Sequence, residues 1–204
     1  MSTVVARPSF KEQMLAAREE AIIQNVNRLL AEKGFDAMTV DEVAAAVGIA
    51  KASLNKHFPS KEDLAAAAMV RVMRRAQQFL AGIEAALPVQ ERLEAVVRWL
   101  LQVHLAGQMP SLPSQNSSLR SVLKSNGDYR EVLAQISDQL CAWIDEGQRE
   151  GIIDPRLPRK AVLYTLYARA CDPVVQFLKS TGEHSDEEIV DVVLSTCFNG
   201  LRAR

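Results

Sequence analysis

Residues 40–58 contain two short helical runs joined at a single glycine, and this segment restricts the possible fold more than any other. The runs at 40–47 and 51–58 are about two turns each, which is too short for a helix that is stable alone. They must therefore pack through fixed apolar positions, which are Val40, Val43, Val47, Ile49, Leu54 and Phe58. Gly48 permits a turn with positive φ between them. The pattern predicts a helix-turn-helix whose second helix has a free outer face.

The rest of the chain also has the pattern of helices. Capping boxes, in which a Ser or Thr hydroxyl and a Glu three residues later bond each other's backbone amides, begin at Ser9, Thr39 and Ser185. No pair of segments has the alternation and turn residues of a β-hairpin. We therefore predict an all-α fold of about nine helices, at residues 10–33, 40–47, 51–58, 61–86, 90–106, 117–125, 128–150, 158–180 and 186–202.

Pro88 is the position where we expect the chain to divide. Residues 1–60 would form an N-terminal three-helix DNA-binding domain with its helix-turn-helix at 40–58, and residues 61–87 a connecting helix. Residues 88–204 would form a larger helical domain for ligand binding and dimerisation.

Composition places the chain among ordinary globular proteins. Hydrophobic residues make up 48% of the 204 residues, and the formal net charge is −1, which argues against a generally basic DNA-binding coat. No apolar run approaches the ~20 residues of a membrane span, and the N-terminal residues lack a secretory signal. We expect a cytoplasmic location, where the widely spaced Cys141, Cys171 and Cys197 would be reduced thiols.

Enzyme motifs are missing from the sequence. It contains no GxSxG, no phosphate-binding glycine loop and no HExxH, and its histidines are His57, His104 and His184. The acidic stretch that follows His184 is better explained by helix capping than by a metal site. We therefore predict a protein that is not an enzyme and uses no metal or cofactor.

The segment TVDEVAAAVGIAKASLNKHFPSKEDL, residues 39–64, resembles the TetR family of transcriptional regulators. The resemblance covers about 50 residues with the first helix, and the remainder is similar only in its helices and in the connection EGIIDPRLP. It implies an N-terminal DNA-binding domain, a divergent ligand domain, and a homodimer that binds a palindromic operator. Two short reading helices about 34 Å apart would match successive major grooves.

The DNA-binding residues that the resemblance implies lie on the second short helix and at two helix N-termini. They are Thr39, Lys51, Ala52, Ser53, Asn55, Lys56, His57 and Lys61. The sequence departs from the family pattern at Ala50, where a capping Ser or Thr is usual, and at Asn55, where Tyr is usual. Asn55 can contact the DNA backbone or an adenine edge, and both alternatives stay open.

The last two predicted helices supply the expected dimer interface. The helix at 158–180 is apolar on nearly every face and contains Pro173, which we expect to kink it. By resemblance these helices pair with their copies through Leu163, Val174, Phe177, Ile189, Val190, Val193, Leu194, Cys197 and Leu201. The alternative is that both helices lie in the core of one chain.

A kink together with aromatic residues on several helices predicts a mainly apolar ligand cavity. Its predicted lining is Leu100, His104, Met109, Ile136, Leu140, Trp143, Tyr164, Tyr167 and Cys171. Each of these residues could instead belong to the core. The effector would be a small apolar or aromatic molecule.

The function predicted from the sequence is a ligand-responsive transcriptional repressor that an effector releases from double-stranded DNA. Two alternatives are a similar DNA-binding regulator without a ligand and a helical module that binds another protein. Only a DNA-binding regulator should lose affinity for DNA steeply as the salt concentration rises.

Overall fold

The structure, a computed structural model, describes residues 9–110 and 118–201, with side chains described up to Asn199. Each assigned element in these ranges is helical, which confirms the all-α fold. The elements are α1 (Phe10–Ala37), α2 (Val40–Val47), α3 (Lys51–His57), α4 (Lys61–Gly82), α5 (Val89–Leu105), α6 (Ser118–Ser125), α7 (Gly127–Arg149), α8 (Arg159–Ala168), a 3-10 turn η1 (Arg169–Cys171), α9 (Pro173–Thr181) and α10 (Asp186–Leu201). None of these helices is long and apolar enough to cross a membrane.

The three capping boxes predicted from the sequence are confirmed. Ser9 and Glu12 bond each other at the start of α1, and Thr39 and Glu42 do so at the start of α2. The Ser185 hydroxyl accepts a hydrogen bond from the Glu188 amide, and the Glu188 carboxylate accepts one from the Ser185 amide at 2.7 Å. Gly34, with φ of 76°, ends the regular part of α1, as predicted.

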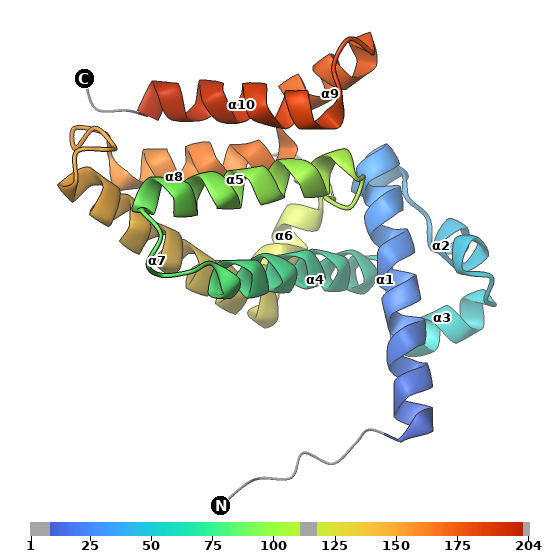
Figure 1. The fold of residues 1–204 in the computed structure, drawn as a ribbon. Helices are drawn as coiled ribbons and strands as arrows, with labels where there is room; N and C mark the ends of the chain where they lie inside the picture. Colours follow the sequence, from blue (N-terminus) through green and yellow to red (C-terminus); the bar gives the residue numbers. More distant parts are fainter. Residues whose placement is uncertain (1–8, 111–117, 202–204) are drawn as a thin grey trace, which may run out of the picture.

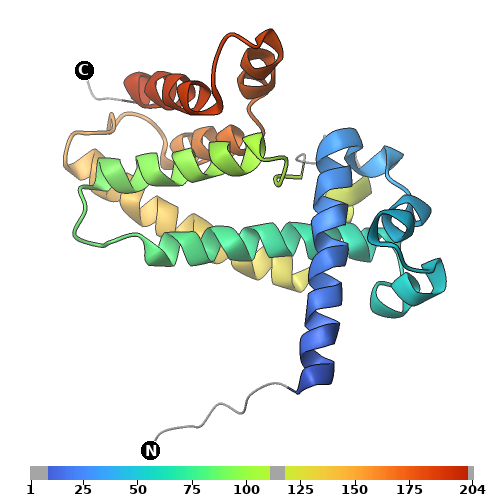
Figure 2. The same ribbon diagram turned by 45° about the vertical axis from the view of Figure 1, so that its right-hand side comes forward.

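The helices form two groups around α4 (Figures 1 and 2). α1 stands across one end of α4, and α2 and α3 lie on the side of α1 away from the rest of the molecule. α5, α8 and α10 are stacked above α4 in the view of Figure 1, and α7 runs below α5 and α8.

Two hydrophobic cores correspond to these groups. The first joins α1, α2, α3 and the first half of α4, and it includes Ile22, Leu54 and Leu64, which are fully buried. Leu119 and Leu123 of α6 also belong to this core, although α6 follows α5 in the chain. The second core joins the end of α4 to α5, α7, α8, α9 and α10. The division of the chain into domains at residue 60 stays a prediction, because α4 and α6 contribute to the first core.

The prediction of one kinked helix at 158–180 was wrong. α8 ends at Ala168, η1 follows, and a new helix α9 begins at Pro173. The Asp172 carboxylate caps α9 by accepting a hydrogen bond from the Val174 amide at 3.0 Å. Proline suits the first turn of a helix because the amide it lacks would have no helical partner there. Pro173 therefore starts a helix. The described residues contain ten α-helices, whereas the sequence predicts about nine.

Candidate nucleic-acid interface

The start of α2 is held firmly by its capping box. The Thr39 hydroxyl accepts a hydrogen bond from the Glu42 amide at 3.3 Å, and the Glu42 carboxylate accepts one from the Thr39 amide at 3.0 Å. Lys33 of α1 donates to the same carboxylate at 2.8 Å. The hydrogen bond from Lys33, with those from Thr39, lowers the pKa of Glu42 to about 2. Thr39 is exposed at the N-terminus of α2, where the helix dipole favours a phosphate.

The turn between α2 and α3 has the geometry that the glycine predicts. Gly48 is in the left-handed region, with φ of 74° and ψ of 33°. The Gly48 amide donates to the Ala45 carbonyl at 3.1 Å, and the Ile49 amide donates to the Ala44 carbonyl at 3.0 Å. These bonds close the end of α2 and set the direction in which α3 begins.

One face of α3 is anchored in the first core. Leu54 is fully buried, and Ile49 and Phe58 pack against the same core from either end of the helix. Ala50 at the N-cap makes no side-chain hydrogen bond, as its missing hydroxyl predicts. The anchoring determines which side chains of α3 face outward.

Four of the six residues predicted on the free face of α3 are exposed, namely Lys51, Ala52, Asn55 and Lys56. Ser53 is half-buried. His57 lies against α1: its side chain is 13% exposed, and its Nδ1 atom is 3.5 Å from a carboxylate oxygen of Glu19. His57 is therefore placed between the two helices, whereas the sequence places it toward DNA.

Two of the predicted lysines have partners within the chain. The Nζ atom of Lys51 is 2.9 Å from Oδ2 of Asp41 on α2. Lys61 lies over the Phe35 ring, 4.4 Å from its centroid, and donates to the Asp36 carbonyl at 3.1 Å. Lys61 thus joins the start of α4 to the end of α1. The sequence does not predict the contact with Asp41, because it joins two different helices across the turn.

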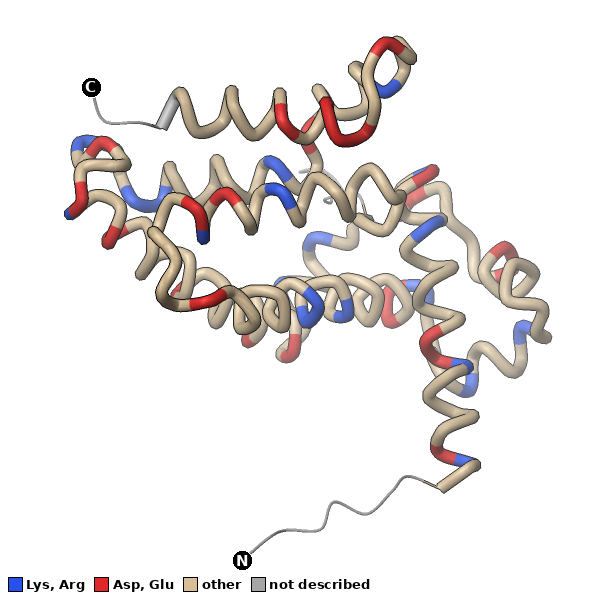
Figure 3. The backbone as a smooth tube through the Cα atoms, viewed as in Figure 1, with Lys and Arg blue, Asp and Glu red and all other residues tan. Residues whose placement is uncertain are grey.

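Charges of both signs occur around the helix-turn-helix (Figure 3). Lys and Arg alternate with Asp and Glu along α1, whereas the charged residues of α2 are the acidic Asp41 and Glu42 and those of α3 are the basic Lys51 and Lys56. Binding of DNA by this domain would therefore depend on where individual cations lie, as the net charge of −1 already indicates.

The residues predicted to line one apolar cavity are dispersed. Ile136, Leu140 and Trp143 are buried in the second core, and Leu100 packs against it. The Tyr167 hydroxyl is 2.8 Å from the Ser137 hydroxyl, and Tyr164 is 65% exposed. His104, Met109 and Cys171 line a cleft of a different kind, next to α1. α7 packs against α5 and α8, so the side chains that these helices turn toward one another fill the second core.

Six residues predicted for the dimer interface are buried within the single chain: Leu163, Ile189, Val190, Val193, Leu194 and Cys197. The apolar stripe of α10 is covered by α5 and α9 of the same chain. Val174 and Phe177 are exposed, at 45% and 71%, and the side chain of Leu201 lies outside the described residues. The sequence pattern could not separate burial inside one chain from burial between two, because both give the same apolar stripe.

A family model and a curated relative match the N-terminal part of the chain. The model, described as bacterial regulatory proteins of the tetR family, matches residues 22–68. The relative is IcaR of Staphylococcus aureus, the negative transcriptional regulator of the biofilm operon icaADBC, and it is 46% identical over 46 residues. That match spans 22% of this chain and 25% of the relative, so it concerns about a quarter of either protein.

Solved structures match over nearly the whole chain. The fatty acid degradation regulator FadR from Bacillus halodurans has a TM-score of 0.66 at 24% identity, covering 92% of this chain and 97% of its own. The ketosteroid transcriptional regulator KstR2 of Mycobacterium tuberculosis has a TM-score of 0.64 at 19% identity, covering 92% and 96%. At these identities the similarity concerns the fold.

Proposed function

We propose that the chain is a transcriptional regulator of the TetR family, whose model matches residues 22–68, and that it binds double-stranded DNA through α3 and represses transcription. The observation that carries this proposal is the orientation of α3. Its Leu54 side is fixed in the core, while Lys51, Ala52, Asn55 and Lys56 are exposed beside the capped N-terminus of α2. Such a helix can lie in a major groove with its polar side chains toward bases and phosphates.

We further propose that the protein acts as a homodimer on a palindromic operator. One seven-residue helix contacts too few base pairs for useful specificity, and two such helices would double the contacts. Four large apolar side chains that a second copy could cover are exposed on α8, α9 and α10, namely Tyr164, Val174, Phe177 and Val192. In this proposal the helices after Pro88 form the dimer, and a small molecule releases it from DNA. FadR is named as a regulator of fatty acid degradation and KstR2 as a ketosteroid transcriptional regulator.

DNA binding is tested with a gel-shift assay on the DNA that flanks the protein's own coding region. Lys56 is the residue to substitute, because it is exposed on α3 and forms no ion pair among the described residues. Lys56→Ala should weaken operator binding and reduce the salt dependence of log K by about one. The free energy of unfolding should stay within about 0.5 kcal/mol of the wild type.

Lys160→Ala is the matched control, since Lys160 is an exposed lysine at the start of α8 in the other helix group. It removes the same charge and should leave operator binding unchanged. Absence of salt-dependent DNA binding by the wild type would contradict the proposed function. Equal effects of the two variants would exclude Lys56 from the interface.

A further inference from the structure

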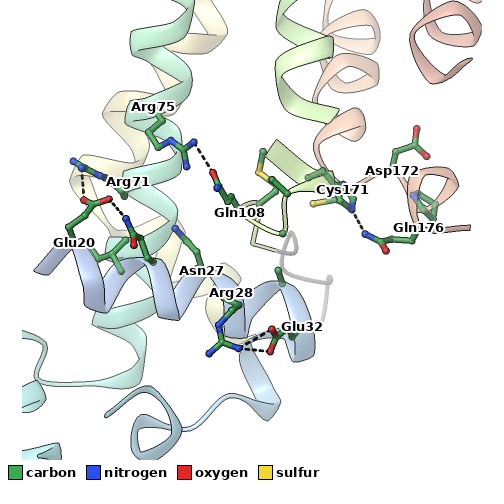
Figure 4. A pocket seen from close by; sticks show the side chains of 18 residues that line it. Glu20, Asn27, Arg28, Glu32, Arg71, Arg75, Gln108, Cys171, Asp172 and Gln176 are labelled. Atoms are coloured by element: carbon green, nitrogen blue, oxygen red, sulfur yellow. Dashed lines mark hydrogen bonds and ion pairs between the residues drawn. The ribbon is translucent and has the colours of Figure 1, made fainter. Parts of the chain in front are cut away.

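A cleft of about 1110 Å³ lies where α1 meets the helices of the second core (Figure 4). Residues of α1 and α4 form one wall, and the other wall comes from the end of α5, the residues that follow it, and the start of α9. The walls therefore belong to the two helix groups. A molecule bound in this cleft would contact the helix that supports the helix-turn-helix and the rest of the protein at the same time.

The charges of the cleft leave one arginine without a carboxylate. Each lining carboxylate is within 3.0 Å of a guanidinium group, in the pairs Glu20–Arg71, Glu32–Arg28 and Asp172–Arg169. Arg75 also lines the cleft, and its partner among the described residues is the neutral Gln108, whose Oε1 atom accepts at 3.0 Å. Figure 4 shows Arg75 extending from α4 toward Gln108. The cleft thus has one positive charge that no carboxylate in the described residues balances.

Asn27 gives the cleft a second unusual feature. It lies on α1, its residue is only 7% exposed, and its Oδ1 atom has no hydrogen-bond partner among the described residues. A buried acceptor without a hydrogen bond destabilises the fold. Figure 4 shows the side chain directed from α1 into the cleft, on the side of Arg75 and Gln108. Its Oδ1 atom is itself buried, so the amide must make a half-turn about χ2 before this atom can accept a hydrogen bond from a molecule in the cleft.

The opposite wall is polar and neutral. The Nε2 atoms of His104 and Gln176 are 3.1 Å apart. Burial lowers the pKa of His104, although the Ala170 carbonyl partly opposes this, and the shift favours the neutral imidazole. With Gln108, these groups favour a hydrophilic ligand over the apolar effector that the sequence predicts.

We propose that this cleft binds a small metabolite with one acidic group, a carboxylate or a phosphate, and a hydroxyl group close to it. The guanidinium of Arg75 binds the acid, because a charge-assisted hydrogen bond is stronger than its present one to a neutral amide. After a half-turn of its amide about χ2, Asn27 accepts the hydroxyl hydrogen. Because Asn27 is on α1 and His104 and Gln176 belong to the other group, bound ligand fixes the position of the helix-turn-helix and changes the affinity for DNA. This last step rests on the proposed function, whereas binding itself does not.

Binding is measured by isothermal titration calorimetry of the full chain with two pairs of probes. The first pair is 3-hydroxybutyrate and butyrate, and the second is glycerol 3-phosphate and inorganic phosphate. Each pair differs in the hydroxyl-bearing part, and comparison of the pairs distinguishes a carboxylate site from a phosphate site. We expect saturable binding of one hydroxylated probe, at least about tenfold tighter than its partner without the hydroxyl, a ratio worth 1.4 kcal/mol.

The variants separate the two contacts. Arg75→Gln should weaken binding of both members of the pair at least about tenfold, and Asn27→Leu should remove only the preference for the hydroxyl. Arg74→Gln is the control, because the neighbouring Arg74 pairs with Asp128 at 3.0 Å and does not line the cleft. If Asn27→Leu does not fold, the comparison of Arg75→Gln with Arg74→Gln still decides the question. Failure of every probe to bind, or equal binding by the wild type and Arg75→Gln, would overturn the proposal.

Coupling to DNA is tested separately with the probe that binds. In the gel-shift assay it should change operator affinity of the wild type about 5–150-fold and leave that of Arg75→Gln unchanged. A probe that binds without changing DNA affinity would disprove the coupling. A wild type that never binds DNA would contradict the proposed function. Calorimetry would still show whether the cleft binds one of the probes.

Discussion

Lys51 and Asp41 form an ion pair across the two helices of the helix-turn-helix, with 2.9 Å between Nζ and Oδ2. Both side chains are exposed, at 53% and 70%. An exposed pair of this kind contributes at most about 1 kcal/mol to stability. Its larger effect is on recognition, because the first cation of α3 is partly neutralised and a carboxylate remains beside the face that would approach DNA phosphates.

Asp41→Asn should therefore tighten DNA binding. Removing the carboxylate frees the Lys51 ammonium and eliminates a repulsion with the DNA backbone, so we expect several-fold higher affinity and a salt dependence steeper by about one. Fluorescence anisotropy over a salt series measures both. Asp138→Asn on α7, where the residue is exposed, is the control for the change in net charge. An equal gain in the two variants would show that position does not matter.

Ala50→Ser should stabilise α3. Ala50 has the extended conformation of an N-cap residue, with φ of −67° and ψ of 140°, but no side-chain hydrogen bond to the helix. A serine hydroxyl there would accept from a free amide of the first turn and raise the free energy of unfolding by roughly 0.5–1 kcal/mol. Urea denaturation measures the change, and amide exchange should slow over residues 51–57. Ala52→Ser, at the second residue of α3, should not raise the free energy of unfolding.

Glu146→Gln should destabilise the second core. Glu146 forms an ion pair with Arg92, whose side chain is only 9% exposed. The Arg92 guanidinium also donates from Nε to the Leu87 carbonyl and lies 5.3 Å from the centre of the Trp143 ring. Without the carboxylate, the buried guanidinium charge is uncompensated, and we expect a loss of roughly 2–3 kcal/mol, less than for a pair that is fully buried.

The neighbouring pair Asp145–Arg159 provides the control for this change. Its side chains are 47% and 51% exposed, so Asp145→Asn should cost less than about 1 kcal/mol. Both losses are measured by urea denaturation. Similar losses in the two variants would contradict the role assigned to burial.

Glu42 should make the N-terminal domain sensitive to acid. The hydrogen bond from Lys33, followed by those from Thr39, lowers its pKa from 4.5 to about 2 in the folded chain. A lowered folded pKa means that the carboxylate adds stability above pH 4.5, and that this stability is lost as the pH falls toward 2.

The difference in the free energy of unfolding between the wild type and Glu42→Gln should therefore be largest above pH 4.5 and shrink as the pH falls toward 2. Urea denaturation across a pH series measures it, and Glu84→Gln, in the turn after α4, controls for the loss of a charge. A difference that stays constant with pH would show that Glu42 does not titrate in this way.

Much of the helix-turn-helix could be predicted because its signals are local. The capping box at Thr39 and the positive φ at Gly48 depend on residues within one or two helical turns. The spacing of Ile49, Leu54 and Phe58 determines which side of α3 is buried. A period of 3.6 residues makes such a face readable from the sequence. Residues 51, 55 and 56 were placed on the outer face for this reason.

Partners across the chain could not be read in this way. His57 was expected to face DNA, but α1 brings Glu19 within 3.5 Å of it. The apolar stripe of α10 fits a dimer interface and a monomer core equally well, and contacts with α5 and α9 bury it in the core.

The sequence by itself determined where the helices begin, where the turn at Gly48 lies and which face of α3 is free, because these depend on backbone conformation and on spacing within a few residues. Only the tertiary structure decided that Pro173 starts a helix capped by Asp172, and that Asn27 and Arg75 meet His104 and Gln176 around one polar cleft. Those residues are separated by up to 149 positions between Asn27 and Gln176, the difference of their numbers. Their meeting depends on the angle at which α1 crosses the rest of the molecule, and that angle is fixed by packing of both cores along α4.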